Sequence, residues 1–128
     1  MSTSDPMFIL YVASQEKSKA FYQSVLLIDP ILDVPGMTEF KIADHAILGL
    51  MPENGIATIL GEKTPHPNTG NGIPRSELYL FVEDPEAYYA RAIRNGAKAI
   101  STCELRNWGD KVAYCADPDG HILAFAKK

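Results

Sequence analysis

The histidines of this chain are its most versatile side chains, because an imidazole can bind a metal or transfer a proton near neutral pH. The three histidines lie more than 20 residues apart, whereas local metal motifs place their ligands a few residues apart. His45 and His121 lie next to turn residues, and His66 lies between two prolines. The spacing predicts solvent-exposed turn residues, and it indicates neither a metal site nor a Ser-His-Asp or Cys-His arrangement.

Two cysteines, Cys103 and Cys115, are too few for a disulfide framework. They predict reduced thiols in a cytoplasmic protein. Cys115 follows Tyr114 in an alternating strand pattern, so we expect it to be buried and to behave as a small hydrophobe.

Three other side chains could act on a ligand. Glu77 begins an apolar strand, where its carboxylate could pair with a cation or act as a general base whose pKa an apolar cavity raises. Arg75 could pair with a ligand anion or simply with solvent. Trp108 precedes a loop glycine, where an indole could border a pocket or cover the core.

Composition limits the class of partner. The 128 residues include 12 Lys and Arg against 16 Asp and Glu, a net charge of −4, which excludes the basic face of a nucleic-acid-binding protein. The longest apolar run, residues 7–13, is far too short to cross a bilayer. We expect neither nucleic acid nor membrane as a partner, and one domain with a real hydrophobic core.

Hydrophobic patterning predicts two copies of one strand–helix–strand–strand unit. The first begins with strand 7–12 and a helix from Ser14 to about Leu27, capped by Ser14 and ended by Asp29-Pro30. The second begins with strand 77–82 and a helix that starts at Asp84-Pro85 and ends at Gly96. Further strands are predicted at residues 31–34, 38–42, 46–51, 97–100, 111–116 and 121–126, with another short strand at 56–60.

Residues 61–76 hold three prolines and three glycines, which predicts irregular chain, either a linker or a loop over a site. On the two sides of this segment, an offset of 70 residues places strand on strand and helix on helix, with Val12 over Val82. This offset predicts an internal repeat.

Four stretches resemble the vicinal-oxygen-chelate superfamily, the group of glyoxalases, bleomycin-resistance proteins and extradiol dioxygenases. They are Leu10-Tyr11-Val12 with Ser18-Lys19-Ala20-Phe21-Tyr22, Phe81-Val82-Glu83-Asp84-Pro85-Glu86-Ala87, Trp108-Gly109-Asp110-Lys111, and the turn Asp117-Pro118-Asp119-Gly120 with His121. The resemblance implies an α+β fold in which two βαβββ modules form a curled mixed sheet around a shared concave cavity. It also implies a homodimer of one glyoxalase-like domain, 1–128, with repeats at about 7–60 and 76–126 joined by the Pro/Gly-rich loop 61–75.

In the metal enzymes of that superfamily, ligands project inward from the opening and closing strands of each module. The matching positions here are Met7, Gly49, Glu77 and Ala124. A thioether is a soft ligand, glycine and alanine offer no ligand atom, and one glutamate cannot hold a divalent ion alone. We therefore expect no metal and no cofactor.

Strand alternation then predicts the lining of the cavity, because residues two apart share a face. The predicted ligand-binding residues are Met7, Ile9, Tyr11, Ile47, Gly49, Met51, Glu77, Tyr79, Phe81, Trp108, Ile122 and Ala124. Glu77 is expected to be the one ionisable group facing the cavity floor, and Phe125 is expected on the opposite side, under a helix.

Three functions remain open. The first is a metal-free binding protein resembling the bleomycin-resistance group, which sequesters an amphipathic or planar small molecule in an apolar aromatic cavity. The second is a metal-dependent glyoxalase-like lyase or dioxygenase, and the third is a metal-free enzyme that uses Glu77 as its base. The missing ligands favour the binding protein, and no residue is assigned as catalytic.

Overall fold

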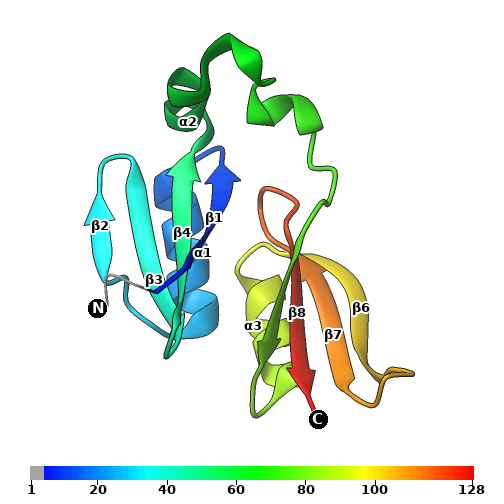
Figure 1. Ribbon diagram of the computed structural model, residues 1–128. Helices are drawn as coiled ribbons and strands as arrows, with labels where there is room; N and C mark the ends of the chain where they lie inside the picture. Colours follow the sequence, from blue (N-terminus) through cyan, green and yellow to red (C-terminus); the bar gives the residue numbers. More distant parts are fainter. Residues whose placement is uncertain (1–4) are drawn as a thin grey trace. The chain divides into compact units, whose positions relative to one another are not determined.

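The computed structural model describes residues 5–128, which fold into two compact units (Figure 1). The first unit comprises the described residues up to Gln23 together with Leu27–Asn71, and the second comprises Ser24–Leu26 with Gly72–Lys128. Each unit contains the predicted βαβββ pattern and a four-stranded mixed sheet. The α+β fold of two such modules is therefore confirmed.

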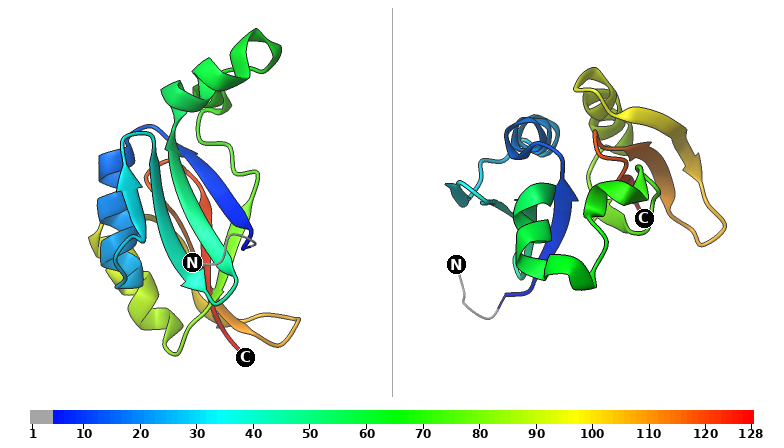
Figure 2. Two further views of the ribbon diagram at one scale, coloured as in Figure 1. Left: turned by 60° about the vertical axis from the view of Figure 1, so that its left-hand side comes forward. Right: turned by 90° about the horizontal axis from the view of Figure 1, so that it is seen from above.

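The first sheet has the strand order β1-β4-β3-β2, in which β1 and β4 are parallel and the other pairs are antiparallel. Helix α1 lies along one face of this sheet in both Figure 1 and Figure 2. The elements of this unit are β1 (Met7–Val12), α1 (Gln15–Leu26), β2 (Leu32–Val34), β3 (Met37–Ala43), β4 (Ala46–Pro52), α2 (Glu53–Leu60) and the 3-10 turns Gly61–Lys63 and Pro67–Gly70.

Helix α1 begins as predicted and ends by another device. The Ser14 hydroxyl accepts a hydrogen bond from the Lys17 backbone N–H at 3.2 Å, so Ser14 is the N-cap. At the other end, Leu27 adopts a left-handed conformation with φ 58°, and its N–H bonds to the carbonyl of Gln23. The helix therefore ends at Leu26, close to the predicted end at about Leu27, although the left-handed Leu27 ends it rather than Asp29-Pro30.

The predicted short strand at residues 56–60 was also wrong, because this segment belongs to helix α2. Its apolar residues Ile56, Ile59 and Leu60 recur at helical spacing, and Glu53 in the first turn favours a helix N-terminus. A short apolar run does not distinguish strand from helix by itself. The segment 61–76 contains two 3-10 turns, and His66 caps the second by accepting from the Asn68 N–H at 3.1 Å.

The second sheet repeats the topology of the first, with the strand order β5-β8-β7-β6. Strands β5 and β8 are parallel, as β1 and β4 are in the first sheet. Helix α3 covers one face of the second sheet (Figure 1). On that side the centres of the Tyr88 and Phe125 rings lie 5.5 Å apart. Phe125 therefore packs under a helix as predicted. The elements are β5 (Glu77–Phe81), α3 (Pro85–Arg94), β6 (Lys98–Leu105), β7 (Lys111–Ala116) and β8 (Ile122–Lys127).

Both ends of α3 follow the sequence signals. Asp84 accepts a hydrogen bond from the Ala87 N–H at 3.2 Å, and Pro85 occupies the first helical turn. Gly96 follows the helix with φ +100°, a conformation that glycine adopts without strain. Within residues 5–128, none of the helices is long and apolar enough to span a membrane.

Candidate functional site

Within the second unit, helix α3 covers one face of the sheet, and we call the opposite face its open face. Tyr79 on β5 is paired with Ala124 on β8, which is paired with Tyr114 on β7. Ala124 is fully buried between the two tyrosines, and Val112 and Ala126 extend the same apolar cluster. The open face therefore has a floor of small side chains flanked by two phenol rings.

A chain of hydrogen bonds crosses this open face. The Trp108 indole N–H donates to the Tyr79 hydroxyl at 3.0 Å, and that hydroxyl donates to a carboxylate oxygen of Asp110 at 2.7 Å. An indole N–H can only donate a hydrogen bond, and a carboxylate can only accept one. The Tyr79 hydroxyl must therefore accept from the indole and donate its single proton to the carboxylate. The chain fixes the indole on its loop, although that side chain is 56% exposed.

Both phenols of the open face remain protonated to higher pH than a free tyrosine. Burial raises the pKa of Tyr79 above its ordinary value of 10.0, and the hydrogen bond to Asp110 raises it further. Burial also raises the pKa of Tyr114, with a second contribution from the charge of Glu77. At neutral pH both hydroxyls are neutral, so they can bind a ligand group but cannot serve as bases.

Arg106 holds the loop end of this face in place. Its guanidinium donates to the Val112 carbonyl at 2.8 Å and to the Ser101 hydroxyl at 2.7 Å, and it lies 5.0 Å from the centre of the Tyr114 ring. These contacts join strands β6 and β7, so Arg106 positions Tyr114 by stacking on it.

Glu77 occupies a different environment from the one predicted. It lies at the start of β5, where its side chain is exposed, and its register partner on β8 is Ile122. Asp110 is a second carboxylate on the same face and is only 8% exposed. The expectation that Glu77 is the one ionisable group on this face was therefore wrong, and Asp110 was missed because its loop returns to β5 over a separation of 31 residues.

The first sheet has its own open face, opposite α1. The register pairs Met7 with Ile47, Ile9 with Gly49 and Tyr11 with Met51, so these six predicted residues share that face. The three β1 side chains are 36–40% exposed, whereas Ile47 is fully buried. On β3, Glu39 is paired with Gly49 and lies on the same face.

The remaining predicted residues occupy the second open face. Phe81 and Trp108 are each 56% exposed, and the Phe81 ring meets the Tyr79 ring edge-on at 5.4 Å. The predicted set therefore falls into two groups of six, one on each sheet.

The positions where superfamily metal enzymes carry ligands do not form a donor set here. Gly49 offers no side chain, and a Cβ atom added there would lie 3.1–3.3 Å from Ile9, Met37 and Met7, so no ligating side chain fits without displacing them. Ala124 is fully buried and carries no ligand atom. A divalent ion that needs several oxygen or nitrogen ligands does not fit these residues.

Another group of metal-type side chains lies at the turn before β8. Asp117, Asp119 and His121 have potential ligand atoms within 4.8 Å of one another. The Asp117 carboxylate accepts hydrogen bonds from the backbone N–H groups of Asp119 and His121, both at 2.9 Å, and the His121 Nδ1 lies 2.9 Å from it. These hydrogen bonds to the Asp117 carboxylate stabilise the predicted turn. His121 is half-buried, so the prediction that it is solvent-exposed was wrong.

The other two histidines also have local partners. His66 is half-buried rather than solvent-exposed as predicted, and its Nε2 lies 2.9 Å from the side-chain oxygen of Asn54. His45 is exposed as predicted, and it lies 3.3 Å from Asp5. His66 thus ties the second 3-10 turn to helix α2.

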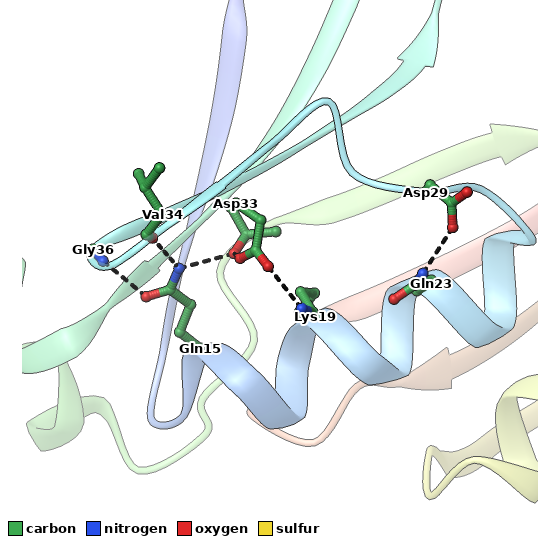
Figure 3. Close-up of polar contacts among 8 residues, drawn as sticks. Gln15, Lys19, Gln23, Asp29, Asp33, Val34 and Gly36 are labelled. Atoms are coloured by element: carbon green, nitrogen blue, oxygen red, sulfur yellow. Dashed lines mark hydrogen bonds and ion pairs between the residues drawn. The ribbon is translucent and has the colours of Figure 1, made fainter.

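The first unit also contains a hollow of about 330 Å³ between α1 and the β2–β3 turn, lined in part by Gln15, Lys19 and Asp33. Figure 3 shows the Gln15 amide bonded to the Val34 carbonyl and to the Gly36 N–H, at 2.8 and 3.0 Å. Lys19 pairs with Asp33 at 2.7 Å. The polar groups here bond to one another and hold the hairpin to the helix, so this hollow is structural.

The model of the glyoxalase/bleomycin resistance protein/dioxygenase superfamily matches residues 6–125, nearly the whole of the two repeated units. The chain belongs to this superfamily. Uncharacterised proteins from Mycobacterium bovis and Mycobacterium tuberculosis are 32% identical to this chain over 72 residues, which is 56% of its length. The matched region covers 47% and 42% of those proteins, so it spans less than half of their length.

Solved structures of glyoxalase-superfamily proteins have the same fold. A glyoxalase-related enzyme from Fulvimarina pelagi has a TM-score of 0.82 at 19% identity, covering 99% of this chain and 89% of that one. A superfamily enzyme from Burkholderia phytofirmans has a TM-score of 0.75 at 16% identity, covering 94% of this chain and 95% of the other. At such identities the likeness establishes the glyoxalase fold alone.

Proposed function

We propose that this superfamily member is a metal-free binding protein that sequesters an amphipathic or planar small molecule. The observation that carries the proposal is the Trp108–Tyr79–Asp110 hydrogen-bond chain on the second open face. It holds an exposed indole in one orientation beside the Tyr79 ring. An aromatic surface fixed before binding loses little conformational entropy when a ligand stacks on it.

The aromatic rings of this face suit a planar group, and they tolerate a positive charge. The Lys128 ammonium lies 4.9 Å from the centre of the Phe81 ring, an attraction between a cation and an aromatic face. A ligand that carries both a flat ring and a cation could use the same ring face. Ile122 and Ala124 supply an apolar floor, and Glu77 adds an exposed carboxylate at one end.

The donor set argues against the metal-dependent lyase or dioxygenase. Of the four positions taken from the superfamily, Met7, Gly49 and Ala124 supply no hard or borderline ligand atom. The metal-free enzyme with Glu77 as base receives no support from geometry, because Glu77 is exposed rather than enclosed by apolar groups. Binding without turnover is the function that these residues support best.

Fluorescence can test the proposal directly, because Trp108 is the chain's single tryptophan. Titration with planar aromatic compounds should quench or shift its emission at saturable concentrations. Tyr79→Phe removes the hydroxyl that holds the indole and should weaken such binding several-fold. Tyr88→Phe is the matched control, since Tyr88 lies on the α3 side of the same sheet and should leave binding unchanged. The proposal would be contradicted if no compound changed the Trp108 emission. It would also be contradicted if Tyr79→Phe and Tyr88→Phe lost equal affinity.

We also propose that the protein is a cytoplasmic homodimer. Each sheet has edge strands, and edge strand β6 exposes Ile100 and Leu105, 51% and 70% of whose surfaces are accessible. Open apolar edges favour pairing with a second chain. Light scattering at micromolar concentration should give twice the chain mass of 14.1 kDa, and a stable species at 14.1 kDa would contradict the dimer.

A further inference from the structure

Glu39 is a carboxylate-bearing residue buried on the open face of the first sheet. Its neighbours along β3 face the helix: Thr38 accepts a hydrogen bond from Gln15 of α1, and Phe40 is fully buried in the core. Alternation therefore directs Glu39 to the opposite, open face. It is only 8% exposed, and within residues 5–128 its carboxylate makes no hydrogen bond or ion pair.

The side chains around Glu39 are apolar and adaptable. Its register partner is Gly49, and three side chains converge above that glycine: Ile9, Met7 and Met37 come within 3.1, 3.3 and 3.3 Å of where a Cβ atom would lie. Methionine side chains are flexible and polarisable, so they adjust to the shape of a bound group. Met7 and Ile9 are 36% and 40% exposed, which leaves this wall accessible to a ligand.

A charged group near Glu39 on the same face does not neutralise it. Lys41 lies two residues further along β3, is paired with Ile47, and is exposed without an ion pair to Glu39. Within residues 5–128, the side-chain atoms that are fully buried without a partner belong to Ser18, Arg91 and Arg106, so the Glu39 carboxylate keeps an accessible edge that a ligand can contact. An accessible carboxylate that is surrounded by apolar side chains can form a charge-assisted hydrogen bond with a cationic ligand.

We propose that Glu39 is the charged anchor of a binding site for an organic cation. The ammonium or amidinium group of the ligand contacts the Glu39 carboxylate, and the apolar part of the ligand packs against Met7, Ile9 and Met37. The inference rests on the proposed binding function, and it names the charge of the small molecule. It also assigns that charge to Glu39 of the first unit rather than to the exposed Glu77 of the second.

The experiment compares two ligands of equal shape and two variants of equal charge. Phenethylammonium and neutral 2-phenylethanol are titrated into the full chain by calorimetry, and then into Glu39→Gln and Glu77→Gln. Each variant removes one carboxylate, so each changes the net charge from −4 to −3. Phenethylammonium should bind the unaltered protein at least tenfold more tightly than 2-phenylethanol. Glu39→Gln should remove that preference, and Glu77→Gln should change it by less than twofold.

A readout on the unaltered protein keeps the test independent of how the variants fold. With ¹³C-methyl-labelled methionine, the methyl signals of Met7 and Met37 should shift on addition of phenethylammonium, in proportion to occupancy. Glu39→Gln should fold about as stably as the parent, because within residues 5–128 the Glu39 carboxylate makes no hydrogen bond or ion pair that the substitution would break.

The failures of the two proposals are distinguishable. If planar compounds quench Trp108 but phenethylammonium has no advantage over the alcohol, the Glu39 site is refuted and the binding function stands. Equal losses in the Glu39 and Glu77 variants also refute the Glu39 site, since only general charge would then be at work. If neither phenethylammonium nor 2-phenylethanol binds, and no planar compound changes the Trp108 fluorescence, both proposals fail.

Discussion

Replacing Tyr79 by Phe should destabilise the protein measurably, although it removes a single oxygen atom. That oxygen bonds to Asp110 at 2.7 Å and to the Trp108 N–H at 3.0 Å. Asp110 is only 8% exposed, so its carboxylate would lose a partner that water replaces poorly. A hydrogen bond to a charged group contributes about 1.5–3 kcal/mol. The indole contributes less, because it is 56% exposed and water can bond to it.

We therefore expect Tyr79→Phe to lower the free energy of unfolding by about 2 kcal/mol, which in a domain of this size lowers the Tm by roughly 6–10 °C. Urea unfolding followed by circular dichroism gives the first quantity and thermal unfolding gives the second. Trp108 emission should shift to longer wavelength in the folded variant, since its indole is no longer held.

A double-mutant cycle with Asp110→Ala isolates the bond itself. When both groups are absent, neither is left unsatisfied, so the double variant should be more stable than the sum of the single losses predicts, by about 1 kcal/mol or more. If Tyr79→Phe costs less than about 0.5 kcal/mol and the coupling energy is zero, the hydrogen-bond chain does not hold this face and the reasoning is wrong.

Three further changes test other parts of the fold. Gly120→Ala should destabilise the protein more than Gly36→Ala. Both glycines have φ above +90°, but of the two only Gly120 would bring a Cβ against backbone, 2.8 Å from the Gly72 carbonyl oxygen. The denaturant concentrations at the unfolding midpoints of the two variants measure the difference. Burial, and secondarily the charge of Asp117, raises the pKa of Cys115 from 9.0 to about 12, so its contribution to stability is present below pH 9 and is lost as the pH rises toward 12. Cys115→Ala should flatten that alkaline decline, by up to about 1.4 kcal/mol per pH unit, in urea unfolding at pH 8–11. Gln15→Ala should lower the Tm more than Lys19→Ala, because Gln15 bonds to three groups of the β2–β3 hairpin whereas the Lys19–Asp33 pair lies at the surface.

The sequence predicted the repeated architecture because strand alternation and helix capping are local signals. The offset of 70 residues equates Met7 with Glu77, and these residues begin the matching strands β1 and β5. Ser14 and Asp84 cap the two helices through their own side chains. Helix α2 escaped prediction, since a run of five apolar and small residues carries no period that separates it from a strand.

The carboxylates of the two open faces escaped prediction for different reasons. Asp110 belongs to a quoted loop motif, but its bond to Tyr79 forms between residues 31 apart, and no local pattern encodes that approach. Glu39 could have been found, because it alternates with the apolar Phe40 on a predicted strand and must face away from the core. Residue preferences argue against a buried glutamate, so the alternating pattern alone does not predict one at this position.

Equivalent positions of the two open faces explain how one fold can present different chemistry on each sheet. Gly49 and Ala124 occupy the centre of their floors, paired with Ile9 and Tyr79 on the opening strands. A small residue at this central position leaves space for larger neighbouring side chains to pack against it. In the first unit these are the thioethers of Met7 and Met37, and in the second they are the phenol rings of Tyr79 and Tyr114. The chemistry of each face is then set by the flanking side chains. The small residue at the centre of each floor therefore makes room for the apolar surface on which we propose that a small molecule binds.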